Sequence, residues 1–354
     1  MIFPKFAGQG RWRWAGILME RNMAGHPRKR PIWRGASVVL ALLSAAASLA
    51  GCGGKQPEAA QVLRVGNQRG GTHALMLAAG QLKDMPYKIE WAEFPNAQPL
   101  IEAIATNALD LGLVGGPSFL FAYKNDQRLR AIQALSGGTK QEVAGVLVHK
   151  NASFANMQDL RGKAIGTTRG SVGHSLLLQA LRQSGMKPSD VRISFVAPTE
   201  AVAAFASGDL DALAIWVPYL ATAVLRHDAR VLTYAHRGTS SYLFQVTSES
   251  SIKDKRALLE DFSRRYGRAQ SWANSHPRQW GEILAKETGL PLDVANYTAE
   301  HMRWWPVPID AQVIESQRVA ARDFGTGGPA QNFDIARGFD ASLNTDPTAK
   351  GKPD

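Results

Sequence analysis

The chain of 354 residues resembles itself when it is shifted by about 100 positions. Residues 65–70 (VGNQRG) then fall on residues 165–170 (IGTTRG), and residues 102–122 fall without a gap on residues 203–223. The second match pairs the Leu-Asp dipeptides 109–110 and 210–211, and also Pro117 with Pro218. Two matches in the same order at nearly the same offset predict two similar α/β lobes.

Each copy reads locally as a helix, a turn, a short apolar strand and then a second helix with proline in its first turn. Strands are predicted over residues 88–94, 143–148, 164–166, 192–196 and 242–246, and helices over 99–106, over 173–185 and from a cap at Thr199. Because strands alternate with helices, we expect mostly parallel sheets. Further on only helices are expected, over residues 253–274, 277–287, 292–302 and 310–324.

The order of these elements predicts the domain boundaries. We expect residues 62–150 and 241–338 to form lobe 1 with its C-terminal helices, and residues 151–240 to form lobe 2. The two crossings, near residues 148–152 and 237–242, would form the hinge. Residues 339–354 are expected to be a polar tail without function.

Cys52 is the only cysteine, and it follows an apolar run over residues 36–50 that is preceded by Arg28, Lys29, Arg30 and Arg34. The run is too short to span a bilayer, which needs about 20 residues. We therefore expect residues 1–51 to be the signal peptide of a lipoprotein, Cys52 to carry the lipid, and residues 52–61 to be a tether. The alternative is a buried segment that ends in an incidental cysteine, and the start is open between Met1 and Met23.

The net charge of +11 belongs mostly to the N-terminal segment. Residues 1–51 hold eight Lys/Arg and one Glu, so the rest of the chain has 33 cations, 29 anions and a net charge of +4. Nucleic-acid binding needs a clustered basic surface and is therefore not expected. The mild excess of positive charge does suit a small anionic ligand. With Cys52 lipidated, no cysteine remains for a disulfide, a thiolate metal site or a nucleophile.

A cleft between two such lobes is the expected ligand site, because ligands of parallel α/β sheets lie at the carboxyl ends of strands. Four segments occupy that position: residues 67–72, 115–119, 169–174 and 216–219. Gly170 and Gly173 bracket Ser171 at a helix start and predict free N–H groups that suit an oxyanion. Arg69 and Arg169 could add charge-assisted hydrogen bonds.

These residues also have structural explanations. The glycines could form turns without contacting a ligand, and Ser171 could cap its helix without contacting one. The two arginines could be solvated charges at the edge of the cleft. A place in the core is the alternative to a cleft wall for Phe119, Trp216, Tyr219 and Tyr242. Neither His73 nor His174 has a partner at metal-ligand spacing, so we expect packing or a helix-end hydrogen bond for both.

Several motifs resemble those of the aliphatic sulfonate-binding proteins of ABC importers, within the wider nitrate, sulfonate and taurine group. They are residues 63–71 (LRVGNQRGG), residues 165–166 with 169–171, residues 209–212 (DLDA) with 216–218 (WVP), and residues 240–242 (SSY). The resemblance runs from about residue 63 to residue 324. It implies an α/β fold of the type II periplasmic-binding class, with two lobes, a two-crossing hinge and a C-terminal helical cap. It also implies a monomer on the periplasmic side of the cell envelope that delivers a small anion, similar to an alkanesulfonate, to an ABC permease and its ATPase.

The resemblance carries five ligand contacts onto this chain: Gln68, Gly115, Ser171, Trp216 and Tyr242. Together with the argument from the strand ends, the predicted ligand-binding set is Gln68, Arg69, Gly70, Gly115, Gly116, Arg169, Gly170, Ser171, His174, Trp216, Tyr219 and Tyr242. The chain departs from the family pattern in two loops. The family often has an acid inside the WVP motif at 216–218, and a more polar loop where residues 115–117 here read GGP.

Two other classes of function remain as alternatives. An enzyme is one, because relatives of this fold include pyrimidine-synthesising proteins and some lyases; however, the chain has no Gly-x-Ser-x-Gly or His-x-x-x-His motif. Ser171 and His174 could be mistaken for a dyad, but at a helix start they are expected to cap and pack. An envelope sensor lipoprotein without a transporter is the other, and the ligand could also be taurine, nitrate, an aryl sulfonate or a thiamine pyrimidine. No cofactor, metal or catalytic residue is predicted.

Overall fold

The computed structural model describes residues 61–69, 71–137, 142–234, 241–323 and 334–344. They belong to one compact unit, residues 59–354. The expected signal peptide, Cys52, most of the tether and Gly70 lie outside the described residues. No helix in the described part of the chain combines the length and apolarity needed to cross a bilayer.

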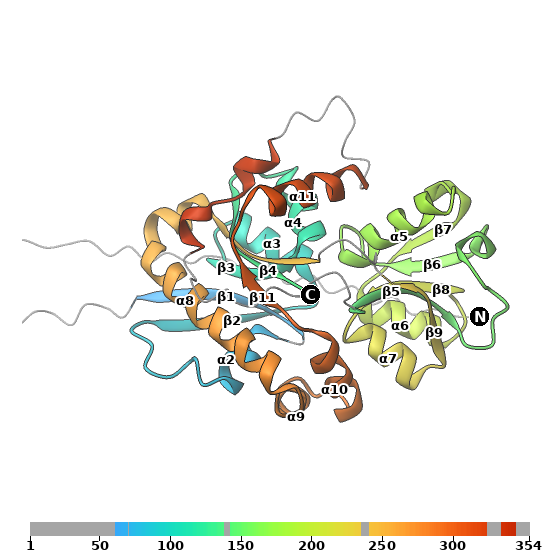
Figure 1. The fold of residues 1–354 in the computed structure, drawn as a ribbon, viewed down its shortest axis with the longest axis horizontal. Helices are drawn as coiled ribbons and strands as arrows, with labels where there is room; N and C mark the ends of the chain where they lie inside the picture. The colour runs from blue at the N-terminus through green and yellow to red at the C-terminus, as the bar shows by residue number, and fades with distance from the viewer. Residues whose placement is uncertain (1–60, 70, 138–141, 235–240, 324–333, 345–354) are drawn as a thin grey trace, which may run out of the picture. The chain divides into compact units, whose positions relative to one another are not determined.

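The first sheet has the strand order β11-β4-β10-β3-β1-β2 (Figure 1). Its strands are β1 (Val62–Gln68), β2 (Lys88–Phe94), β3 (Leu111–Gly115), β4 (Leu129–Ser136), β10 (Tyr242–Ser248) and β11 (Trp305–Val307). Its connecting helices are α2 (Thr72–Ala78), α3 (Ala97–Ala105) and α4 (Gly116–Tyr123). On α3 the side chains of Leu100, Ile101 and Ile104 are buried, as the spacing of its apolar residues predicts.

The second sheet has the strand order β7-β6-β8-β5-β9. Its strands are β5 (Ala144–His149), β6 (Ala164–Thr167), β7 (Arg192–Phe195), β8 (Ala212–Trp216) and β9 (Ala229–Tyr234). Its helices are α5 (Val172–Gln183), α6 (Pro198–Ala206) and α7 (Tyr219–Arg226). The two sheets therefore confirm two α/β lobes with the same element order.

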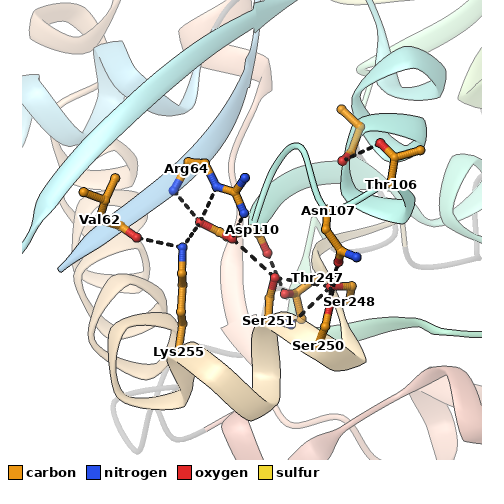
Figure 2. Close-up of polar contacts among 11 residues, drawn as sticks. Val62, Arg64, Thr106, Asn107, Asp110, Thr247, Ser248, Ser250, Ser251 and Lys255 are labelled. Carbon is orange, nitrogen blue, oxygen red and sulfur yellow. Dashed lines mark hydrogen bonds and ion pairs between the residues drawn. The ribbon is translucent and has the colours of Figure 1, made fainter. Parts of the chain in front are cut away.

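The paired dipeptides 109–110 and 210–211 hold equivalent positions in the two lobes. The backbone N–H of Arg64 at the start of β1 donates to Asp110 Oδ2 at 2.7 Å, and the N–H of Ala164 at the start of β6 donates to Asp211 Oδ2 at 2.8 Å. Asp110 is the more buried of the two and also binds the side chains of Arg64 and Lys255 (Figure 2). The repeat in the sequence thus reflects one hydrogen bond, which joins β1 to the start of β3 in the first lobe and β6 to the start of β8 in the second.

Five sequence predictions need correction. The strand expected to lead out of lobe 1 is β5, which pairs with β8 and β9 in the second sheet; the first crossing therefore lies between Ser136 and Ala144, not near 148–152. The sheets are mixed, because β5, β10 and β11 run antiparallel to their neighbours. The strand β11 interrupts the region where only helices were expected. Thr199 is not a cap, since α6 begins at Pro198, and Pro218 is the N-cap of α7 rather than a first-turn residue, whereas Pro117 does lie in the first turn of α4.

The C-terminal helices cover the first lobe and also reach the second. They are α8 (Glu249–Ser275), α9 (Pro277–Thr288), α10 (Leu292–His301) and α11 (Ala311–Asp323). Helices α8 and α9 pack on α2, and α11 packs on α4, but α10 contacts α7 and α11 contacts α5. The expected polar tail is partly core: Leu343 is fully buried, and Phe339 packs against Phe119 and Phe244.

Candidate functional site

A cavity of about 140 Å³ lies where the two lobes meet. The ends of β1 and β3 and the start of α3 line it from the first lobe, and the start of α5 and the end of β8 line it from the second. Residues from the C-terminal part of the chain, 243–304, close the remaining side. The cavity is therefore placed as the sequence predicted for the cleft, at the carboxyl ends of strands.

Five of the predicted ligand contacts line this cavity: Gln68, Arg69, Gly115, Ser171 and Trp216. The Gln68 side chain is held in place by a hydrogen bond of 2.6 Å from its Nε2 to the carbonyl of Leu113, which bridges β1 and β3. Arg69 is an exposed residue. Among the described residues that line the cavity, Arg69 is the one with a charged side chain, so the cavity favours an anion.

Helices α4 and α5 are two of the helices that begin at the cavity. The N-cap of α4 is Gly115, which makes no side-chain cap, so the first N–H groups of this helix depend on other acceptors. Ser118 in the same turn also lines the cavity. The N-cap of α5 is Ser171, whose Oγ accepts a hydrogen bond from the N–H of His174 at 3.1 Å. Ser171 Oγ thus caps its helix, which is the structural role given above as the alternative to ligand contact. The residue also lines the cavity.

His174 and Arg169 support the loop before α5 and do not line the cavity. The Nδ1 of His174 accepts a hydrogen bond from the N–H of Gly170 at 3.2 Å. Burial, helped by the charge of Arg169, lowers the pKa of His174 to about 4, so its ring is neutral at pH 7. Arg169 lies over the ring of Phe195, with its guanidinium carbon 3.8 Å from the ring centroid. The two arginines that were predicted to be equivalent therefore differ in position, and of the two Arg69 lines the cavity.

Ser171 and His174 lie close together because Ser171 caps α5, as the sequence analysis expected, and not because they form a catalytic dyad. Their bond runs from the backbone N–H of His174 to Ser171 Oγ, and the ring nitrogen Nδ1 faces the amide of Gly170 instead. A general base would have to bond the serine hydroxyl through its ring.

Gly170 and Tyr219 join the two lobes instead of lining the cavity. The carbonyl of Gly170 accepts a hydrogen bond from Gln98 Nε2 of α3 at 3.2 Å, and the Tyr219 hydroxyl donates to the carbonyl of Pro95 at 3.4 Å. Gly170 has a φ of +68°, and a Cβ there would lie 2.5 Å from Cδ1 of Phe121. Only glycine fits this contact without strain.

The remaining predicted residues lie in neighbouring positions. Gly116 packs against α11, since a Cβ there would lie 2.5 Å from Gln317 Oε1. Tyr242 stacks on Phe244 and lines a second cavity that adjoins the first. Trp216 borders both cavities and makes an edge-to-face contact with Tyr219 at 5.8 Å.

Sequence reasoning missed the side of the cavity formed by the C-terminal helices. Tyr266, Gln270, Trp280, Met302 and Trp304 line it there. Gln270 Nε2 donates to the Tyr266 hydroxyl at 2.7 Å, and burial raises the pKa of this tyrosine. A helical apolar pattern identifies such residues as buried but cannot tell a core neighbour from a cavity. Asn96 and Gln98 were missed too, although Asn96 is a recognisable helix cap before α3.

No group of three or more metal-ligating side chains is found in the described part of the chain. The chemistry available in the first cavity is that of hydrogen-bond donors, one cation and aromatic faces.

Comparison with known proteins identifies the family. The model of the NMT1/THI5-like family matches residues 83–280. The chain belongs to this family. An Escherichia coli (strain K12) protein named for binding aliphatic sulfonates is 31% identical to this chain over 288 residues, which cover 80% of this chain and 89% of the relative.

Two solved structures of the same kind share the fold. The periplasmic aliphatic sulphonate binding protein of Escherichia coli aligns with a TM-score of 0.67 and 28% identity, covering 78% of this chain and 91% of that one. The alkanesulfonate-binding protein of Xanthomonas axonopodis pv. citri, bound to MOPS, aligns with a TM-score of 0.68 and 29% identity, covering 76% and 94%. The predicted resemblance and the periplasmic-binding fold are confirmed.

Proposed function

We propose that this protein is an exported solute-binding protein that captures an organic sulfonate between its lobes and delivers it to an ABC permease. The observation that carries the proposal is the first cavity, which both lobes line and in which Arg69 is unopposed by any lining carboxylate of the described residues. The relatives named for sulfonate binding support the same head group. A sulfonate presents three acceptor oxygens, which matches an arginine and helix N–H donors.

The mechanism we propose is closure of the two lobes on the ligand. Gln98 and Gly170 already touch across the cleft, as do Tyr219 and Pro95. A ligand that bonds to both lobes stabilises the closed form by contacts that the open form lacks. The permease would then recognise the closed pair of lobes.

Arg69 and Arg169 provide a matched test of the site. Arg69→Gln removes the cation of the cavity, and a hydrogen bond to a charged group contributes about 1.5–3 kcal/mol, so sulfonate affinity should fall about 10- to 100-fold. Arg169→Gln makes the same change at the equivalent position outside the cavity and should alter the affinity less than about twofold. Titration calorimetry with methanesulfonate measures both. Equal effects of the two substitutions would place the anion elsewhere.

We further propose that the protein is anchored to the cell envelope by lipid at Cys52, after removal of residues 1–51. Cys52→Ser should move the protein from the membrane fraction to the soluble fraction of the expressing cells, and the mature wild-type protein should carry acyl chains by mass spectrometry. An unmodified Cys52, or a wild-type protein already in the soluble fraction, would contradict the anchor.

A further inference from the structure

A second cavity of about 260 Å³ adjoins the first and has a different chemical character. Six apolar side chains border both cavities: Val172, Trp216, Val217, Leu243, Met302 and Trp304. Because the same side chains line both spaces, only their own thickness separates the two. A ligand held by its head group in the first cavity would therefore lie beside this shared wall.

The second cavity does not suit the head group. Among its described lining residues none carries a charge, and its polar groups are those of serines, glutamines, Tyr242 and the indole N–H of two tryptophans. An anion moved there would lose its hydration and gain no cation, which is strongly unfavourable. An apolar group gains by the same transfer.

The size of the second cavity and its aromatic side chains favour a ring. An engineered cavity of about 150 Å³ in another protein binds benzene, and the space here is larger. Three aromatic side chains, Trp216, Tyr242 and Trp304, form part of its wall, and aromatic rings pack well against one another in tilted or offset geometry.

The shared wall can also adapt to a ligand. Met302 is unbranched and partly exposed, so its side chain can turn aside at low cost. The Trp304 Nε1 is buried with no acceptor among the described residues, so an acceptor brought to this wall by a ligand would satisfy it.

We propose that the second cavity holds the tail of the ligand and that this tail is an aromatic ring, so that the substrate class is the arylsulfonates. The inference rests on the proposed function, because it assumes a sulfonate head group at Arg69. It differs from that function in assigning the tail, which the head-group site leaves open.

The test compares three ligands by titration calorimetry on the purified protein: methanesulfonate, hexanesulfonate and benzenesulfonate. Methanesulfonate probes the head-group site alone, and hexanesulfonate has as many carbons as benzenesulfonate without the ring. Burying a benzene ring in place of a methyl group should tighten binding by about 10- to 100-fold. We expect benzenesulfonate to bind more tightly than both alkyl ligands.

Two substitutions fill the second cavity from different helices, Ala320→Leu on α11 and Ser175→Leu on α5. Each should abolish most of the advantage of benzenesulfonate while leaving methanesulfonate affinity within about twofold. Ala311→Leu makes the same change as Ala320→Leu at an exposed residue of the same helix and should leave all three affinities unchanged. The pair from two lobes keeps the test informative if one variant folds poorly.

The outcomes separate the two proposals. Equal binding of methanesulfonate and benzenesulfonate, or a ring advantage that survives both filling substitutions, overturns the assignment of the tail but keeps the sulfonate site. Binding of none of the three ligands overturns the proposed function itself.

Discussion

Replacing Asp110 with asparagine should destabilise the protein far more than the same change at Asp211, its counterpart in the second lobe. The Asp110 side chain is 1% exposed and accepts hydrogen bonds from Arg64 N at 2.7 Å, from Arg64 Nη2 at 2.7 Å and from Lys255 Nζ at 2.7 Å (Figure 2). Asparagine keeps one oxygen but turns an NH₂ group toward Arg64 in either orientation of the amide, because both carboxylate oxygens accept from the Arg64 guanidinium. Removing one partner of a buried ion pair costs about 3–5 kcal/mol.

The partial exposure of the two cations lowers that cost. The side chains of Arg64 and Lys255 are 36% and 27% exposed, so water can solvate part of the charge that Asp110 would leave behind. We therefore expect the free energy of unfolding to fall by about 2–4 kcal/mol in Asp110→Asn. Asp211 is 32% exposed and has one backbone hydrogen bond at 2.8 Å and a lysine at 3.6 Å, so Asp211→Asn should cost about 0.5–1.5 kcal/mol.

Urea denaturation followed by circular dichroism measures both variants. Tryptophan fluorescence as a second probe shows whether the two lobes unfold together, which decides whether one free energy describes the transition. An Asp110→Asn variant that loses no more stability than Asp211→Asn would refute the view that this buried cluster, rather than the shared strand-joining hydrogen bond, stabilises the first lobe.

The stability that Asp110 contributes should also depend on pH. Burial opposes ionisation of Asp110, but the hydrogen bonds from Arg64 and Lys255 outweigh it and lower the pKa below its usual value. The unfolded chain binds the proton more readily, so the stabilisation is present above a pH of about 4 and is lost as the pH falls through the pKa of the folded state. The difference between wild type and Asp110→Asn should therefore be full at pH 7 and shrink in acid.

Two further predictions concern the loop before α5. Because burial lowers the pKa of His174 to about 4, its contribution is present above pH 6.5 and lost as the pH falls from there to about 4. His174→Asn, which keeps an acceptor for the Gly170 amide, should remove about 2.5 kcal/mol of that pH dependence between denaturation series at pH 4.5 and 7.5. An unchanged difference between the two pH values would exclude the histidine as its cause. Gly170→Ala places a Cβ 2.5 Å from Phe121 at a positive φ. We expect the sulfonate affinity measured by calorimetry to fall at least fivefold, while the melting temperature falls by only a few degrees. Unchanged affinity would show that this contact does not limit closure of the lobes.

The sequence could predict those parts of the site that depend on local chemistry. Ser171 precedes a helical pattern and caps it, and Gly115 precedes a proline-started helix and leaves its N–H groups uncapped. Both facts follow from residue types at short spacing, because helix ends need caps whatever the tertiary structure is.

Local chemistry could not separate the two arginines. Arg69 and Arg169 stand in the same position of the repeat, yet one lines the cavity and the other lies over Phe195. The difference depends on the ring of Phe195, which lies on β7 of the second lobe. Such a contact depends on how elements pack together, and the repeated sequence motif gives no information about that packing.

The crossing strands show the same limit at the level of the fold. The strands β5 and β10 occupy equivalent places in the two sheets, since β5 runs antiparallel to β8 and β10 runs antiparallel to β3. An apolar strand pattern predicts that β5 is buried, but partner choice depends on which sheet edge the chain reaches after the crossing.

The sequence by itself determined that the chain has two repeated α/β lobes, where most helices and strands lie and which family it belongs to, because these follow from periodicity and from motifs of adjacent residues. Tertiary structure alone decided which sheet takes β5, that Trp304 and Met302 close the cavity, and that a second, apolar cavity adjoins it. The physical reason is range: helix caps and strand alternation depend on neighbours within a few residues, whereas a cavity is the space left between side chains that lie more than 100 positions apart in the chain.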